Sequence, residues 1–302
     1  MYSLNNIAFS NFGIIPGRVE ASNIAVSGML DMPERIGKIY HSWTGDSGIE
    51  PYVLASEIRY GGRAITFEGF LQAADKAAAY AALNLFYKEL DSYQDLVSLV
   101  TPWSTHQVYI KEKTEVNFLQ QGWVRIGIQF EEPSPPTPEG GAPAGSEINK
   151  PHIDGISFES LGMFLTAFKE HLKRPKTKEQ KFTSYQTAGY QITPPEALEF
   201  EIELIAYAAS YELLKANIQA LHKLLASPGV RNINVDGSLR EVFNTQGFKV
   251  GNMKIASNYA ICKLTLPLMT SRAGAPLQLS PLLFNQYDQM VSNLNLLIQV
   301  NS

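Results

Sequence analysis

The chain has 302 residues, of which 45% are hydrophobic and 18% are charged, and its formal net charge is −4. This length and composition are typical of a globular protein with room for two domains of ordinary size. The negative charge argues against general nucleic-acid binding, which needs an excess of Lys and Arg, and the single cysteine excludes an intrachain disulfide and a four-cysteine zinc site.

The N-terminal segment has neither the basic region nor the apolar core of a secretory signal peptide. No apolar run approaches the roughly 20 residues that cross a bilayer as a helix. We therefore expect a soluble protein that is made in the cytoplasm of its host and contacts no membrane. Without a disulfide, its stability must come from packing or from assembly.

Residues 40–52 combine aromatic and acidic side chains, with Trp43 and Tyr52 on either side of Asp46 and Glu50. Such a loop can be held against a partner surface, can supply an acid–base pair for catalysis, or can bind sugar. Acid–base pairs usually converge from distant segments, whereas local clusters are common in turns. We favour the partner contact and take Trp43 and Tyr52 as its candidate residues.

Residues 65–71 alternate apolar and polar side chains, which is the pattern of a half-buried strand. Asp75 can then cap a helix, because its side-chain oxygen can accept from the first free N–H groups. The helix carries one apolar stripe that is wide enough to lie on a sheet. Further strands are predicted over 96–100, 108–110 and 123–130. The stripe consists of Ala79, Leu83, Phe86 and Leu90.

Residues 131–150 read EEPSPPTPEGGAPAGSEINK, a composition that cannot bury apolar surface and that favours extended geometry. The segment after this linker repeats the order of the first at an offset of 135 positions: an alternating strand over 200–206, a cap at Ser210 and an apolar stripe. The helix is expected to stop at Ser227, before a Pro-Gly pair. The second stripe consists of Leu214, Ile218, Leu221 and Leu225.

The second half continues with a turn at Asp236-Gly237 between two short apolar segments, which is a hairpin signal. Its closing strand, with Cys262, Leu264 and Leu266, matches that of the first half at an offset of 136. Outside the repeat, residues 281–300 follow a Ser-Pro pair with apolar residues on one side, which predicts a C-terminal helix.

These elements predict an α+β protein of two tandem units, each a mostly antiparallel β-sandwich or rolled sheet packed by one helix. The predicted boundaries are 1–131 for the first unit, 132–150 for the linker, 151–272 for the second unit and 273–302 for the C-terminal segment.

The segment 169–181 reads KEHLKRPKTKEQK and is predicted to form a projecting loop or hairpin. It has three interpretations: a solvated hairpin, a charge-paired contact with an acidic neighbour, or a contact with nucleic acid. A single-strand binder would need aromatic residues among the lysines for base stacking, and here there are none. Its candidate subunit contacts are Lys173, Arg174, Lys176 and Lys178.

The sequence contains no metal-binding histidine pattern, no nucleophile elbow, no Walker loop and no dinucleotide-binding glycine motif. Cys262 lies in an alternating strand, where a buried small hydrophobe is the expected role. Glu68, Glu201 and Glu203 lie on the polar face of the repeated strands. They fit a solvated face, or an acidic wall that keeps DNA from sticking in a channel. We predict neither catalysis nor a cofactor or metal.

Two runs in the N-terminal half carry a family resemblance. Residues 60–69 read YGGRAITFEG, in which a Gly-Arg pair opens the alternating strand before the helix, and residues 24–52 contain DMPERIGK and GIEPY. Over residues 5–130 the chain resembles the distal tail (baseplate hub) proteins of long-tailed bacteriophages, of the type found in phages and prophages of Bacteroidetes. The second half is less similar, because Glu196-Ala197 stand in place of the Gly-Arg pair.

The resemblance implies a structural virion protein with a fold similar to that of tail-tube subunits. Such a protein forms a ring that joins the tail tube to the tail tip or the receptor-binding apparatus, and DNA passes through it only as cargo. Two units per chain allow a ring of six chains, which we slightly prefer, or of three chains as a pseudo-hexamer. The alternative from another class is a glycan-binding or glycan-processing protein that uses loop 40–52.

Overall fold

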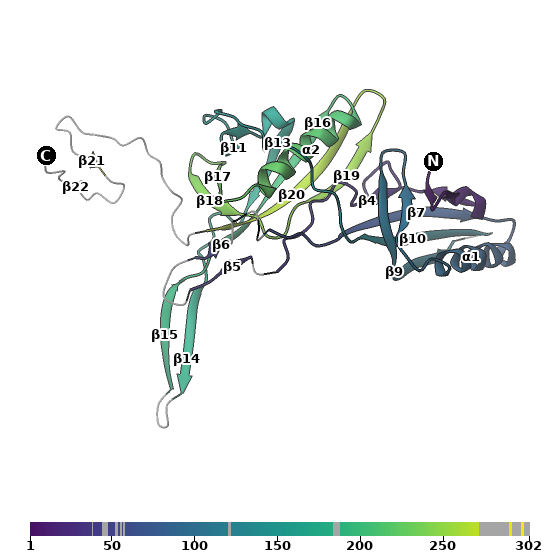
Figure 1. Ribbon diagram of the computed structural model, residues 1–302, viewed down its shortest axis with the longest axis horizontal. Helices are drawn as coiled ribbons and strands as arrows, with labels where there is room; N and C mark the ends of the chain where they lie inside the picture. Colours follow the sequence, from purple (N-terminus) through teal and green to yellow (C-terminus); the bar gives the residue numbers. More distant parts are fainter. Residues whose placement is uncertain are drawn as a thin grey trace.

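The computed structural model places two β-sheets along the long axis of the molecule, with a long hairpin projecting from them (Figure 1). It describes residues 1–271 except 38, 44–47, 52–53, 55, 57, 120–121 and 184–187, and also residues 290–291 and 297–298. Within these residues the chain is mostly β-structure with two α-helices, so the predicted α+β class is confirmed. None of the described helices is long and apolar enough to cross a membrane.

The N-terminal sheet contains eight strands in the described residues. These are β1 (Ser3–Leu4), β2 (Ile7–Ala8), β3 (Ile14–Pro16), β4 (Val26–Ser27), β7 (Arg63–Gln72), β8 (Val97–Val100), β9 (Thr105–Phe118) and β10 (Trp123–Glu132). Their order is β2-β1-β8-β9-β10-β7-β3, with β4 beside β7. The 3-10 helix η1 (Phe9–Phe12) precedes β3, and the helix α1 (Lys76–Asp91) connects β7 to β8.

The C-terminal sheet also contains eight strands in the described residues. These are β11 (His152–Ile153), β12 (Ile156–Ser157), β13 (Met163–Lys169), β16 (Glu199–Ala208), β17 (Arg231–Asn234), β18 (Leu239–Phe243), β19 (Lys249–Ile255) and β20 (Ala260–Thr270). Their order is β12-β11-β17-β18-β20-β16-β13, with β19 beside β20. The 3-10 helix η2 (Glu159–Leu161) precedes β13, and α2 (Tyr211–Ala226) connects β16 to β17.

In the described part of the chain, three two-stranded ladders lie outside the sheets: β5 (Tyr40–His41) with β6 (Glu50–Pro51), β14 (Thr177–Thr183) with β15 (Ala188–Pro195), and β21 (Met290–Val291) with β22 (Leu297–Ile298). The β14–β15 ladder is the projecting hairpin (Figure 1). It shares only residues 177–181 with the basic segment 169–181, so the hairpin lies further along the chain than predicted. The last ladder contradicts the predicted C-terminal helix at its four described residues. Val291 and Ile298 are β-branched and therefore suit a strand better than a helix; the rest of 281–300 lies outside the described residues.

The two sheets place elements of the same kind in the same order. β18 and β19 together take the place of the single strand β9. The register of β9 against β10 shifts between Ile128 and Phe130. At the corresponding part of β20, the pairing changes from β18 to β19. Ile128 faces Phe67, and Leu266 faces Ile202. With the opening strands offset by 135, the closing strands are therefore offset by 138 positions and not by 136 as expected.

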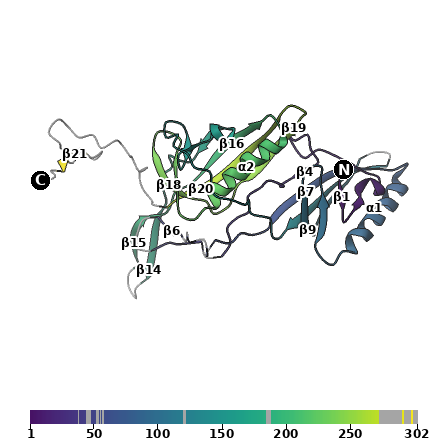
Figure 2. The same cartoon turned by 45° about the horizontal axis from the view of Figure 1, so that its top comes forward.

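The long strands form where the apolar residues alternate. Phe67 and Ile202 are both fully buried, as expected for the inward face of equivalent strands. The helices lie over this face, and Figure 2 shows α2 along the C-terminal sheet. Each helix begins at the expected cap, because Asp75 Oδ1 accepts from Ala78 N at 2.8 Å and Ser210 Oγ accepts from Leu213 N at 3.2 Å. Both predicted apolar stripes are buried.

Each half begins with a two-residue hairpin that the sequence analysis did not detect. Asn5 and Asn6 have φ of 47° and 68°, and Asp154 and Gly155 have φ of 49° and 79°. Two positive φ values in succession match the twist of paired strands and favour Asn, Asp and Gly. The similar segments LNNIAFSNFGI (4–14) and IDGISFESLGM (153–163) contain these hairpins. They are offset by 149 positions, whereas the strands and helices that follow are offset by 135, so one constant offset does not align both.

Candidate functional site

The predicted contact residues of loop 40–52 are only partly described. Trp43 is half exposed, its Nε1 donates to Glu50 Oε2 at 2.7 Å, and its ring meets the His41 ring edge-on at 4.1 Å between centroids. The indole thus occupies one oxygen of Glu50, the carboxylate on which the catalytic alternative depends. Asp46 and Tyr52 lie outside the described residues.

The basic segment begins at the end of β13 and leads into the projecting hairpin. Lys173 is exposed and pairs with Glu170 within the segment, at 2.5 Å. Arg174 and Lys176 are exposed as well. Lys178 lies on β14, where the structure describes the backbone alone. The start of the segment contacts the C-terminal sheet, because Arg240 Nη1 donates to His171 O at 3.1 Å. The hairpin that follows the segment extends away from both sheets (Figure 1).

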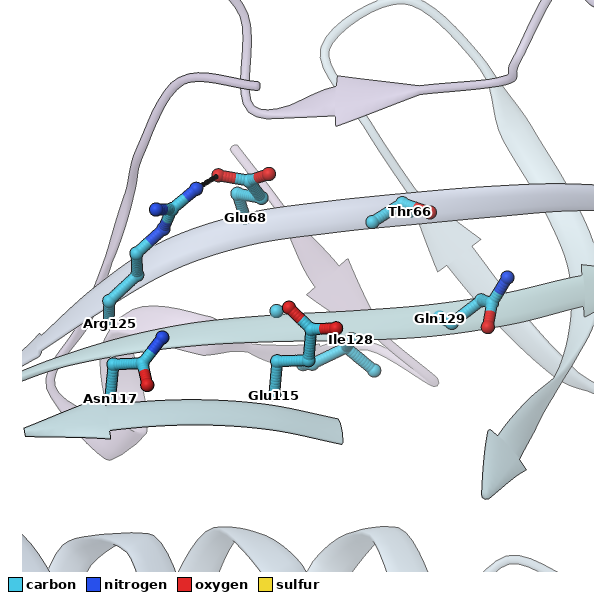
Figure 3. Close-up of a pocket in the computed structure, with 8 residues that line it drawn as sticks. Thr66, Glu68, Glu115, Asn117, Arg125, Ile128 and Gln129 are labelled. Carbon is cyan, nitrogen blue, oxygen red and sulfur yellow. Dashed lines mark hydrogen bonds and ion pairs between the residues drawn. The ribbon is translucent and has the colours of Figure 1, made fainter. Parts of the chain in front are cut away.

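The outer face of the N-terminal sheet is polar and holds a shallow hollow of about 240 Å³. Arg125 of β10 points toward Glu68 of β7 across the hollow, with Nη2 and Oε2 2.6 Å apart (Figure 3). This hydrogen bond raises the pKa of Arg125. The other polar side chains that line the hollow are Thr66, Glu115, Asn117 and Gln129.

The outer face of the C-terminal sheet is also charge-paired. Glu203 accepts from Lys169 at 2.5 Å and pairs with Lys263 at 2.8 Å, and these contacts lower its pKa. Glu201 pairs with Lys169 at 3.2 Å. These carboxylates therefore do not form a surface of unpaired negative charge, because cations on neighbouring strands match them. A period-two reading of one strand cannot detect partners that the sheet brings in from other strands.

A buried polar cluster lies at the end of β10 and was missed by the sequence analysis, which placed Glu132 in the linker. Arg63 Nε donates to Glu132 Oε2 at 3.0 Å, and His106 Nδ1 lies 3.2 Å from the same oxygen. Burial by itself would raise the pKa of Glu132, but the His106 hydrogen bond and the charge of Arg63 outweigh it, and the pKa is lowered. Only the pairing of β10 with β7 and β9 reveals this cluster.

In the same cluster, Ser104 Oγ lies 2.7 Å from His106 Nε2. Ser104, His106 and Glu132 thus follow one another in the order hydroxyl, imidazole and carboxylate, as in a serine-hydrolase triad. Two features favour a structural role. Arg63 holds the carboxylate with two N–H groups. The backbone N–H of Ser104 donates to Thr101 Oγ1 at 2.9 Å, so this group is not available to an oxyanion.

The thiol of Cys262 is the other reactive group that the sequence analysis considered. Cys262 lies in the core as expected, and burial raises its pKa to about 12. The thiol is therefore not a nucleophile at neutral pH. Within the described part of the chain, no three His, Cys, Asp or Glu side chains gather in a way that could hold a metal ion.

The two halves meet along the outer edge of β19. Asn23 N donates to Met253 O at 3.0 Å, Val250 N donates to Asp31 Oδ1 at 2.8 Å, and Met32 forms a bridge with Phe248. Residues 22–35 of the N-terminal half thus run along a strand of the C-terminal half; we call this segment the clasp. A sheet edge is thereby covered by main chain from the other half.

The chain matches no protein-family model and no curated protein sequence. Among solved structures it is similar to the Dit (gp 19.1) protein of SPP1, which is described as a paradigm of the hub adsorption apparatus in phages that infect Gram-positive bacteria. The similarity covers 89% of this chain and 98% of the other, with 9% sequence identity and a TM-score of 0.34. A similarity this weak says nothing about the function of this chain.

Proposed function

We propose that this protein is a structural component of a phage tail: a ring-forming adaptor, built from two tandem copies of one tube-like unit, that joins the tail tube to the tail tip or receptor-binding apparatus. The sequence resemblance over residues 5–130 points to this family. DNA passes through the ring as cargo, and the protein carries out no reaction.

The tandem duplication is supported by the common strand order of the two sheets. It is also supported by the paired hairpins at Asn5-Asn6 and Asp154-Gly155 and by the two capped helices. Independent folds would agree in one such feature, but a match of order, turn type, cap and register shift is expected only from copies of one unit. The β14–β15 hairpin is then an insertion in the second copy, and the loop 40–52 is an insertion in the first.

The observation that carries the ring is the clasp. It joins one unit to the next head to tail, because residues of the first unit cover an edge of the second and not the reverse. Contacts of this heterologous kind form rings when their rotation closes. A repeat of the same contact between chains therefore leads to a ring, with three or six chains as the expected numbers.

The test is the mass and symmetry of the purified full chain, by native mass spectrometry and negative-stain imaging. We expect a closed ring of three or six chains with a central hole that is wide enough for duplex DNA. A monomer at every concentration tested would contradict the adaptor function. A closed ring without a central hole would contradict the passage of DNA but not the assembly.

A further inference from the structure

The clasp contains a buried arginine that occupies a socket on the C-terminal unit. Arg35 N donates to Thr245 O at 2.7 Å, and its Nη2 donates to Leu225 O, in the last turn of α2, at 2.8 Å. The guanidinium lies over the Phe243 ring, 4.6 Å from its centroid. His222, one turn earlier on α2, is buried nearby. The socket therefore combines a helix C-terminus, an aromatic ring and a strand edge, which together suit a planar cation.

The duplication, on which this inference rests, identifies the counterpart of this socket on the N-terminal unit. Tyr109 faces Glu131, and Phe243 faces Met269, so the strand offset of 138 makes Tyr109 the equivalent of Phe243. The helix offset of 135 makes Leu90 the equivalent of Leu225. By the same offset, Tyr87 is the equivalent of His222.

These equivalent residues line an open hollow of about 670 Å³ beside β9. Tyr109 is 43% exposed, whereas Phe243 is 1% exposed beneath Arg35. Among the residues that the structure describes, no strand other than β10 pairs with β9 beyond Val108. The edge and socket that the clasp covers on the second unit are thus open on the first.

The charge of the hollow favours a cation. Asp91 and Asp95 line it and are both exposed, and Asp91 is the last residue of α1, where the helix dipole is negative. Lys111, the one cation among its described lining residues, is already paired with Glu131 at 2.6 Å.

The topology indicates which segment can supply the cation. Arg35 lies on the connection between β3 and β7, and the equivalent connection of the second unit joins β13 to β16. This connection, residues 170–198, contains one arginine, Arg174, which is exposed. The hairpin that follows Arg174 lies at the opposite end of the molecule from α1 in both views (Figures 1 and 2). Arg174 therefore cannot fill the hollow of its own chain.

We propose that the hollow formed by Tyr87, Leu90, Asp91, Asp95 and Tyr109 binds the basic segment 170–176 of a second copy of the chain, with Arg174 in the position that Arg35 takes within the chain. The β14–β15 hairpin of that copy then lies along the open edge of β9, as the clasp lies along β19. The contact between chains repeats the contact between units, and this repetition propagates the assembly head to tail.

The experiment compares the assembly of full-length variants by native mass spectrometry and analytical ultracentrifugation. Arg174→Glu alone, and Asp91→Lys with Asp95→Lys, should each raise the dissociation constant of the assembly by about tenfold or more, because each leaves like charges facing each other across the contact. The three changes combined restore opposite charges and should recover much of the assembly. Arg18→Glu, the same change at an exposed arginine of another loop, is the matched control and should assemble as the wild type does.

The outcomes separate this inference from the proposed function. Wild-type rings that persist unchanged in the Arg174→Glu and Asp91→Lys/Asp95→Lys variants overturn the socket but leave the adaptor intact. A wild-type monomer overturns both. Loss of assembly in the charge variants without recovery in the triple variant also counts against the socket, since a direct pairing requires the rescue; circular dichroism and the thermal midpoint show that each variant is folded.

Discussion

At the scale of single residues, the ion pair of Arg63 and Glu132 ties the start of β7 to the end of β10. The side chains are 10% and 5% exposed, so each charge depends on the other for its compensation. Removing one partner of a buried pair leaves an uncompensated charge, which typically costs about 3–5 kcal/mol. Exposed pairs such as Lys150–Glu159 contribute little by comparison.

We expect Arg63→Met and Glu132→Gln each to lower the free energy of unfolding by about 3–5 kcal/mol. The double variant should lose clearly less than the sum of the two, because it leaves no unpaired charge. Urea denaturation of the four proteins at neutral pH measures this coupling. Additive losses would show that the two side chains act independently.

His222 makes the stability of the protein depend on pH. It packs edge-on against Tyr60 and Phe248, and burial, with a smaller contribution from the charge of Arg63, lowers its pKa from 6.5 to about 4. Between these two pH values the unfolded chain binds more protons at this site than the folded protein does. The contribution of neutral His222 to the free energy of unfolding is therefore fully present above about pH 6.5. It falls by roughly 3 kcal/mol as the pH drops toward 4.

The variant His222→Leu keeps the site apolar and removes the titrating group. We expect its free energy of unfolding to fall less than that of the wild type between pH 7 and pH 4.5, as measured by urea denaturation at both pH values. Glu132, whose pKa is lowered, also loses its stabilising contribution in acid, but it does so equally in both proteins. Identical pH dependence in the two proteins would assign the acid sensitivity to other groups.

At the scale of elements, β7, β16 and the helices α1 and α2 form for local reasons that the sequence shows directly. Alternation places Phe67 and Ile202 on the buried face, and the caps at Asp75 and Ser210 fix where the helices begin. Trp123 is the first residue of β10 and was expected on its buried face together with Ile126 and Ile128. It is 37% exposed and lies on the opposite face of the strand from these two residues. The position of one large apolar residue is therefore weaker evidence than the period of several.

Phe67→Asp and Ile202→Asp test the register of these strands. Each change buries a carboxylate without a partner, so we expect unfolding or aggregation of the protein. Thr66→Asp, one residue away on the polar face of the same strand, is the control and should leave the protein folded. Expression, gel filtration and thermal denaturation distinguish these outcomes, and a folded Phe67→Asp protein would contradict the register of β7.

At the scale of the whole molecule, the clasp fixes one unit against the other, and Gly247 is central to it. Its φ is +67°, and a Cβ atom there would collide with the carbonyl oxygen of Met32 and crowd that of Pro33. Gly251, four residues on, lies in β19 with no atom within 4 Å of its Cβ position. An alanine should therefore be disruptive at Gly247 and tolerated at Gly251.

We expect Gly247→Ala to loosen the junction between the units, seen as faster limited proteolysis in the clasp and a lower thermal midpoint. Gly251→Ala should change neither by much. Equal effects of the two substitutions would show that the close approach at Gly247 is not what holds the units together.

The sequence indicated individual helices and strands but not their arrangement in space. Periodicity and capping identified α1, α2, β7 and β16, because these features depend on neighbours in the chain. The offset of the closing strands was predicted as 136 but is 138 in the ladders. Side chains alternate between the two faces of a strand, so two registers that differ by two residues bury the same pattern of positions. The apolar pattern alone therefore could not distinguish the two offsets. The domain boundaries at 131, 150 and 272 remain predictions.

By itself, the sequence determined the α+β class, the two helices with their caps and buried stripes, and the buried face of β7 and β16. Only the tertiary structure decided the partners of Glu132, Glu68 and Glu203, the path of the clasp along β19 and the burial of Phe243 beneath Arg35. The physical reason is that these contacts join residues far apart in the chain, as Val250 and Asp31 are, at a separation of 219 positions. Periodicity records which face of an element is buried, but not which distant group lies against it.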